Sequence, residues 1–449
     1  MNKLRLTTIT FVLLYQTMFG QVYTLKDCIN YAQQNNSNIK ISKMNYEISE
    51  KQINETIATG LPQIDFTGTL TDNLKVTTSL LPGELMGQPG TFIPVKMGTK
   101  YNVSAGLKLT QKIFDPSFWV GLKAAKLSEK YYQQNSEFTS ERTFYDVSSK
   151  YYKVIIAQKQ LINLKSILET SSKSLNAVEL KYQNGIAKKI DVDKIKVSYN
   201  KTKSQYQQTE LNYKQAINNL KLSIGLPVDS PLELSDVSLS DIESFTYENI
   251  NADNSIIEGR VDYKILKTQL ELYETDRQNN VLSYLPTLSF FANFNYQAMR
   301  KEFNFFDSKE TWFNSSAIGL ELKIPIFSGL KRLNKVYESD INVEIAKENL
   351  KYSTQSIKVE LSNYDIQYYS ALDNIKNEKE NLVLAESVFT NTQLEFSQGT
   401  GSSLDLIQAE GSLNETQNLY YTKLLNLYIA KLDLEKSKGT LINFINNQK

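Results

Sequence analysis

The chain has 449 residues, enough for two or three domains, and its 50 Lys and Arg residues balance 49 Asp and Glu residues almost completely. A net charge of +1 argues against electrostatic capture of nucleic acid. The absence of histidine and the single cysteine exclude Ser-His-Asp and Cys-His nucleophiles, histidine-containing zinc sites and intrachain disulfides. We therefore expect a protein that is not an enzyme and holds no metal or cofactor.

The first 20 residues have the pattern of a secretory signal peptide. Lys3 and Arg5 precede a short apolar run from Ile9 to Tyr15, and Gly20 precedes the expected cleavage. The run is shorter than the roughly 20 residues that a spanning helix needs. With a mean hydropathy of −0.38 for the whole chain, the sequence predicts an exported protein without a transmembrane helix.

Cys28 is a candidate for lipid attachment that its surroundings do not favour. It follows Lys26 and Asp27, whereas lipoprotein signals place small residues before the cysteine. Thr24 and Asp27 have the spacing of a capping box, which predicts that a helix begins here. We expect Cys28 to be a small buried residue of that helix.

The chain contains two copies of one sequence pattern. Residues 180–225 align without a gap to residues 394–439, which lie 214 positions later. The matched pairs include Leu180/Leu394, Gly185/Gly399, Asp191/Asp405, Tyr206/Tyr420 and Gly225/Gly439. Residues 38–66 map in the same way onto 262–290, but 224 positions apart. This change in offset predicts that residues 72–100 form a loop about ten residues longer than its counterpart.

Each copy combines strands with very long helices. Apolar residues alternate with polar ones in four segments, which predicts strands at 61–72, 100–114, 285–298 and 312–327. Apolar residues recur at steps of three and four in two helical hairpins, at 116–225 and 329–439, as coiled coils require. The predicted organisation is a first repeat at 21–227, an acidic segment at 228–255, a second repeat at 256–440 and a tail at 441–449.

Four strands that are apolar on one face cannot close a membrane barrel within one chain. An open edge in lipid would leave backbone donors and acceptors unpaired at a cost of several kcal/mol each. Copies of the chain must close it: two would give eight strands with a filled lumen, and three would give twelve strands with a pore. The helices carry Lys, Glu, Asn and Gln on their outer faces, so they belong in water.

The order of motifs resembles that of the TolC family of outer-membrane efflux proteins. The motifs are Leu61-Pro62, Leu285-Pro286, the strand-to-helix junction 322–329, and the Gly399 to Asp405 turn. The resemblance implies a mixed fold: a homotrimer with a twelve-stranded barrel in the outer membrane and an α-helical coiled-coil tunnel in the periplasm. It also implies a periplasmic adaptor, or membrane fusion protein, and an inner-membrane pump as partners, and a passive conduit for small molecules such as drugs or metals.

The turns around Gly185 and Gly399 should lie at the narrow periplasmic entrance of such a tunnel. The resemblance implies that Asp405 lines this entrance, with Asp191 at the equivalent position of the first repeat. Three copies of Asp405 would form an acidic ring that favours cations. The alternative is structural, because a helix dipole favours an Asp in the first turn in any protein.

Three positions of the entrance depart from the family pattern. Gln408 stands where the family's best-studied member has a second acidic residue, and Phe396 and Gly401 stand in place of a Tyr and an Arg that hold its entrance closed. The hydrogen-bonded contact by which that Tyr and Arg close the entrance is therefore absent here, or other residues form a contact with the same role.

Other segments admit two interpretations. Trp119 and Trp312 lie near strand ends and are candidates for an interfacial aromatic belt. Residues 228–255 contain seven acidic residues and no Lys or Arg. In the resembling family such a segment surrounds the middle of the tunnel, while its composition equally suits a solvated linker.

Alternative functions remain open at this point. A surface coiled-coil protein would explain the helices but not the four strands, and a hydrolase with paired carboxylates lacks a recognisable site. Within the conduit class, type I protein secretion is the alternative to small-molecule efflux, because the pump selects the cargo.

Overall fold

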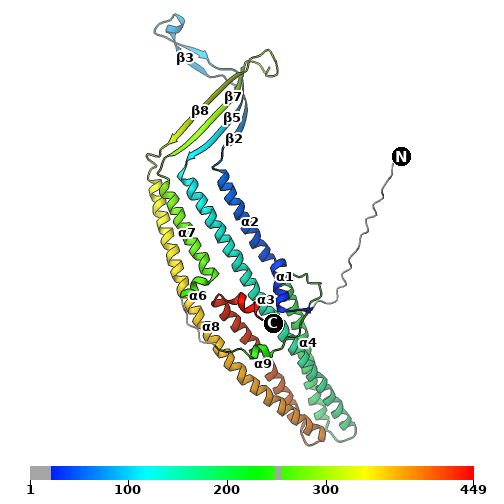
Figure 1. Cartoon of the computed structure of the whole chain (residues 1–449). Helices are drawn as coiled ribbons and strands as arrows, with labels where there is room; N and C mark the ends of the chain where they lie inside the picture. Colours follow the sequence, from blue (N-terminus) through cyan, green and yellow to red (C-terminus); the bar gives the residue numbers. More distant parts are fainter. Residues whose placement is uncertain (1–21, 248–253, 449) are drawn as a thin grey trace, which may run out of the picture. The chain divides into compact units, whose positions relative to one another are not determined.

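The computed structural model describes residues 22–247 and 254–448 (Figure 1), so the expected signal peptide lies outside the described residues. The chain divides into two compact units. The first contains the residues up to Met44, Gln134–Lys264 and Tyr352–Lys449, and the second contains Asn45–Gln133 and Ile265–Lys351.

The second unit contains an antiparallel sheet in the order β2-β5-β7-β8. Its strands are β2 (Gln63–Asp72), β5 (Tyr101–Phe114), β7 (Thr287–Arg300) and β8 (Phe313–Lys323). Strand β8 ends four residues before the predicted boundary at 327. The reason is that β7, its pairing partner, begins only after Pro286, and Pro325 has no N–H to donate. Strands β2 and β8 are the two edges of the sheet.

Strand register places most of the apolar positions of this sheet on one face. Phe66 pairs with Leu107, which pairs with Phe294, while Ala292 pairs with Ile318. The opposite face is mainly polar: it carries the rows Asp65/Lys108/Asn293/Ala317 and Thr67/Gly106/Asn295/Ser315, and Phe291 is an aromatic residue on it. The apolar face remains exposed: Phe66 is 70% and Ile318 is 79% accessible.

Residues 72–100, predicted as a loop longer than its counterpart, are longer but contain a structured hairpin that the sequence did not indicate. Strands β3 (Thr78–Pro82) and β4 (Phe92–Lys96) pair with each other, and a 3-10 turn η1 (Gly83–Met86) lies between them. At the base of the hairpin, the Asn73 N–H donates to the Lys100 carbonyl at 2.6 Å.

Long helices connect to the sheet. They are α2 (Ser37–Ala58), α3 (Pro116–Gln183), α7 (Val261–Leu282) and α8 (Lys331–Gln398), and α3 and α8 have 68 residues each. The Asp115 carboxylate accepts a bond from the Ser117 N–H where α3 begins. Within the described ranges, no helix is both long enough and apolar enough to cross a bilayer.

The first unit has a core formed by α1 (Leu25–Asn35), α3, α4 (Lys189–Ile224), α9 (Ser403–Ser437) and α10 (Leu441–Asn446). Cys28 is fully buried in α1, and both bonds of the Thr24–Asp27 capping box are present, as predicted. Leu424 and Tyr428 of α9 are fully buried, and α10 adds Leu441 from the segment expected to be a tail.

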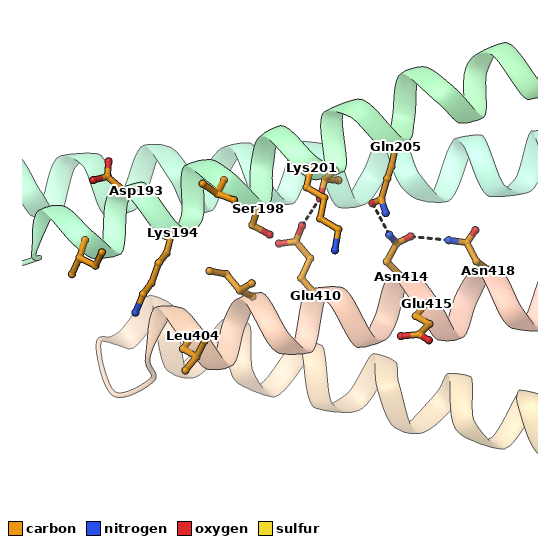
Figure 2. A pocket seen from close by; sticks show the side chains of 15 residues that line it. Asp193, Lys194, Ser198, Lys201, Gln205, Leu404, Glu410, Asn414, Glu415 and Asn418 are labelled. Atoms are coloured by element: carbon orange, nitrogen blue, oxygen red, sulfur yellow. Dashed lines mark hydrogen bonds between the residues drawn. The ribbon is translucent and has the colours of Figure 1, made fainter.

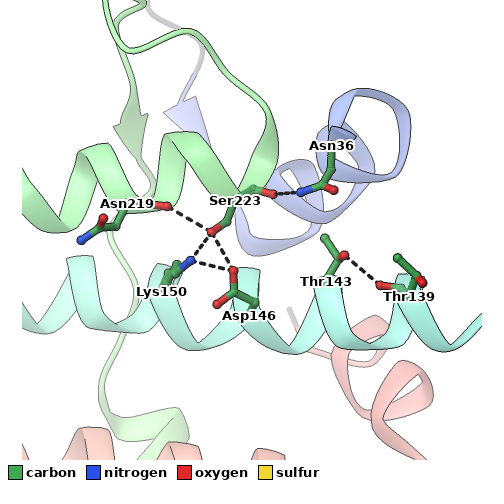
Figure 3. A network of polar contacts seen from close by, with 7 residues as sticks. All are labelled: Asn36, Thr139, Thr143, Asp146, Lys150, Asn219 and Ser223. Atoms are coloured by element: carbon green, nitrogen blue, oxygen red, sulfur yellow. Dashed lines mark hydrogen bonds and ion pairs between the residues drawn. The ribbon is translucent and has the colours of Figure 1, made fainter. Parts of the chain in front are cut away.

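A buried polar network fixes the break between α1 and α2 against α4 (Figure 3). The Asn36 amide donates to the Ser223 carbonyl at 2.7 Å, and its oxygen accepts bonds from the backbone N–H groups of Asn38 and Ile39. The Ser223 hydroxyl donates to Asp146 at 2.8 Å. These bonds satisfy backbone groups that the end of one helix and the start of the next leave unpaired.

The described part of the acidic segment is packed. Strand β6 (Glu233–Leu234) pairs in parallel with β1 (Val22–Tyr23), and α5 (Ser240–Glu243) and α6 (Asn254–Gly259) follow. Asp236 pairs with Lys159 at 2.6 Å, and Glu243 accepts bonds from Tyr420 and Lys379. A free solvated linker is therefore the wrong interpretation for residues 228–247.

Candidate functional site

Two helix-to-helix turns lie together at one end of the first unit. One connects α3 to α4 at Gly185, and the other connects α8 to α9 at Gly399. Their φ angles are +74° and +84°, a region that side chains disfavour. A Cβ at either glycine would meet nothing within 4 Å, so backbone conformation alone explains the glycine.

A small apolar core holds the two hairpins together near these turns. It contains Val178, Val192, Ile195, Phe396 and Leu406. Phe396 is 9% exposed, and its carbonyl accepts a bond from the Lys181 ammonium at 3.2 Å. Phe396, which stands in place of the family's Tyr, therefore packs between the hairpins.

Asp191 and Asp405 occupy the same position in the first turn of their helices but have different partners. Asp405 is exposed, and the Ser402 hydroxyl donates to its carboxylate at 2.7 Å. Asp191 accepts a bond from the Ser403 hydroxyl of the other hairpin at 2.8 Å. Gln408, one turn beyond Asp405, is also exposed. Asp405 thus faces solvent, while Asp191 joins the hairpins.

Beyond the turns, α4 and α9 border a groove of about 800 Å³ (Figure 2). Its lining includes Val197, Leu404 and Ile407 together with Lys194 and Lys201. Gln205 and Asn414 are bonded across it at 2.9 Å.

Glu410 is a residue of this groove that sequence reasoning missed. It is 7% exposed and accepts bonds from the Thr202 hydroxyl, at 3.0 Å, and from Ser171. Burial raises the pKa of its carboxyl above the ordinary value, and the two hydroxyl bonds oppose this shift only in part. The sequence does contain a sign that Glu410 is buried. Glu410 follows Ala409, a residue of the predicted helix seam, and Thr202 lies on the seam of the facing helix.

The two tryptophans lie in the second unit. Trp312 stacks on Tyr296 with ring centroids 6.0 Å apart, and Trp119 is 66% exposed near the start of α3. Among the described residues, no group of three or more Cys, Asp or Glu side chains has the geometry of a metal site.

Comparison with known proteins decides which family has this architecture. The sequence pattern of the family described as Outer membrane efflux protein matches residues 28–226 and 267–440, which is most of the chain. The chain belongs to the outer membrane efflux protein family. This confirms the resemblance stated above and places the chain in the outer membrane.

Individual members of the outer membrane efflux protein family are distant in sequence. Outer membrane protein TolC of Vibrio cholerae is 18% identical over 351 residues, covering 76% of this chain and 77% of that protein. TolC of Salmonella enteritidis is 22% identical, with 75% and 69% covered.

Solved structures of outer-membrane channels share the fold. CusC aligns with a TM-score of 0.74 at 17% identity, covering 92% of this chain and 91% of that chain. VceC from Vibrio cholerae aligns with a TM-score of 0.72 at 15% identity, with 92% and 96% covered. CmeC from Campylobacter jejuni gives 0.73 at 14% identity, with 93% and 86% covered.

Proposed function

We propose that three copies of this chain form a passive conduit through the outer membrane for small molecules delivered by an inner-membrane pump. The observation that carries the proposal is the four-stranded sheet, which has one apolar face and two edge strands, β2 and β8. Because the strands alternate in direction, β8 of one copy runs antiparallel to β2 of the next. Twelve strands then close without an edge, and the polar face lines the pore.

An exposed stripe on α8 supports assembly of the helices as well. Ile345, Tyr352, Val359 and Ile366 follow one another at steps of seven residues and are 54%, 74%, 59% and 63% exposed. Apolar residues at this spacing form the seam of a coiled coil. Packing of this stripe against a neighbouring copy would build the wall of a helical tunnel.

The turns at Gly185 and Gly399 form the entrance of the proposed tunnel. Three exposed Asp405 carboxylates would surround the opening and favour cations. Gln408 is uncharged, so it adds nothing to this preference. The groove between α4 and α9 offers apolar side chains together with charged residues of both signs, Lys194 and Lys201 beside Asp193 and Glu415, to a helical segment of a periplasmic adaptor.

Single-channel conductance in planar bilayers tests the proposal. The wild-type protein should form cation-preferring pores, and Asp405→Asn should lower both the cation preference and the block by divalent cations. Gln408→Glu should raise both, because it adds a second ring of charge one turn away. A protein that passes no ions would refute the conduit, and an Asp405→Asn pore with unchanged selectivity would refute the acidic ring.

A further inference from the structure

The hairpin β3–η1–β4 extends beyond the end of the four-stranded sheet (Figure 1). Several of its apolar side chains are exposed. Leu80, Leu85 and Phe92 are 64%, 73% and 70% accessible, and Leu74 at its base is 90% accessible. Register places Leu80 opposite Pro94 and Pro82 opposite Phe92, so this face is apolar toward the tip of the hairpin, while Thr78 opposite Lys96 is polar at its base. A two-stranded hairpin is at best marginally stable in water, so this face needs a partner.

Aromatic side chains at the same end of the sheet indicate the level of the lipid headgroups. Tyr101 and Tyr296 lie on the apolar face, in line with Leu107 and Phe294. Tyr296 stacks on Trp312, and Tyr101 contacts Phe303 edge-on at 5.7 Å. Aromatic girdles of this kind mark the membrane–water interface of barrels. The hairpin begins directly beside this girdle, because Asn73 is bonded to Lys100.

Charge on the hairpin favours an anionic partner. Lys75, Lys96 and Lys100 are exposed, while Glu84 is the one acidic residue between Asn73 and Tyr101, giving a net charge of +2. The Lys100 ammonium lies 4.8 Å above the Tyr101 ring, on the lipid-facing side of the sheet. Lysines near an interface extend their ammonium groups to the phosphates while their stems cover apolar surface.

We propose that this hairpin is a lipid-binding arm that bends back from the end of the sheet onto the outer leaflet, where Leu80, Leu85 and Phe92 enter the acyl chains and its lysines contact lipid phosphates. The inference rests on the proposed function, since it requires the sheet to be in a membrane. The alternative is that the apolar face packs against the same hairpin of another copy. Charge disfavours this, because two hairpins with a net charge of +2 repel one another.

Fluorescence quenching tests the arm in the full-length assembly. Leu85→Cys is labelled with an environment-sensitive dye, and Lys309→Cys in the exposed loop between β7 and β8 is the matched control. Cys28 should not react, because it is fully buried and burial raises its pKa to about 12. The protein is inserted into vesicles of phosphatidylcholine and phosphatidylglycerol that contain a lipid-borne quencher, and iodide serves as the aqueous quencher.

We expect the lipid-borne quencher to remove most emission from the label at 85 and little from the label at 309. Lys75→Gln and Lys96→Gln should each lower the ratio of bound to free arm about fivefold, as expected from about 1 kcal/mol per surface cation. The effect should disappear in vesicles of phosphatidylcholine alone.

Two results would overturn the arm: equal quenching of both labels by iodide, or energy transfer between labels at 85 on different copies. Conductance of the same samples separates this failure from failure of the proposed function. Open channels with an unquenched arm refute the arm alone, whereas protein without conductance refutes the conduit.

Discussion

The helical core of the first unit and the sheet of the second unit bury their apolar residues in different ways. Leu424 and Tyr428 of the core are completely buried by the chain itself, whereas Phe66 and Ile318 of the sheet are 70% and 79% exposed. Burial of apolar surface contributes roughly 25 cal/mol per Å². The core obtains this stabilisation within one chain, whereas in the proposed assembly the sheet would obtain it from lipid and from neighbouring copies.

The largest expected effect is on the core, from Gly225→Ala. Gly225 has a φ of +79°, and a Cβ there would lie 2.6 Å from the Asn35 carbonyl oxygen. Strain and overpacking together should lower the free energy of unfolding by about 3 kcal/mol or more. Gly185→Ala is the matched control, with a similar φ and free space, and should cost only about 1–2 kcal/mol. Chemical unfolding followed by circular dichroism measures both, and equal losses would contradict the contact with Asn35.

Phe66→Lys should impair insertion of the sheet into lipid and leave the helical core of the first unit folded. A lysine on the lipid-facing side of a barrel costs about 2–4 kcal/mol near the middle of the bilayer. Thr67→Lys, one residue along on the polar face, should insert normally. Folding into lipid vesicles, followed by guanidinium titration, compares them. If the two variants insert equally well, the apolar face does not meet lipid.

The smallest effect should come from Glu410→Gln, which tests how burial of this carboxyl near the turns contributes to the pH dependence of stability. The raised pKa of Glu410 means that the folded chain retains a proton that the unfolded chain releases near 4.5. Stability contributed by this group is therefore greatest at low pH and falls as the pH rises from 4.5 toward the raised value. The glutamine variant should lose that part of the slope.

Thermal unfolding between about pH 4 and pH 8 measures the slope. Glu415→Gln, an exposed change on the same helix, is the control and should keep the wild-type slope. A slope unchanged in Glu410→Gln would show that other buried carboxyls, such as Asp433 with its raised pKa, dominate the pH dependence.

Sequence periodicity predicted the regular elements because each of them is long, so that a single residue that breaks the pattern does not hide it. Ten to fourteen alternating residues indicated β2, β5 and β7, and heptad steps indicated α4 and α9. The hairpin β3–β4 was missed because Leu80-Leu81-Pro82 and Ile93-Pro94-Val95 are short and do not alternate.

Contacts between distant segments could not be predicted in this way. The bonds of Glu243 to Tyr420 and Lys379 connect positions far apart in the chain. At the turns, the sequence identified Gly185 and Gly399 but not which Asp would bind Ser403. Only the packing of α4 against α9 decides that Asp191 makes this bond, and that Glu410 is buried.

Helices α3 and α8 have the same length, 68 residues, and this equality constrains how such a protein can evolve. Deleting four residues from α8 alone would withdraw its turn by about 6 Å and separate Ser403 from Asp191. Insertions and deletions in the two arms are therefore tolerated only as matched pairs. The hairpin β3–η1–β4 has no counterpart in the second repeat, so its length is free of this requirement.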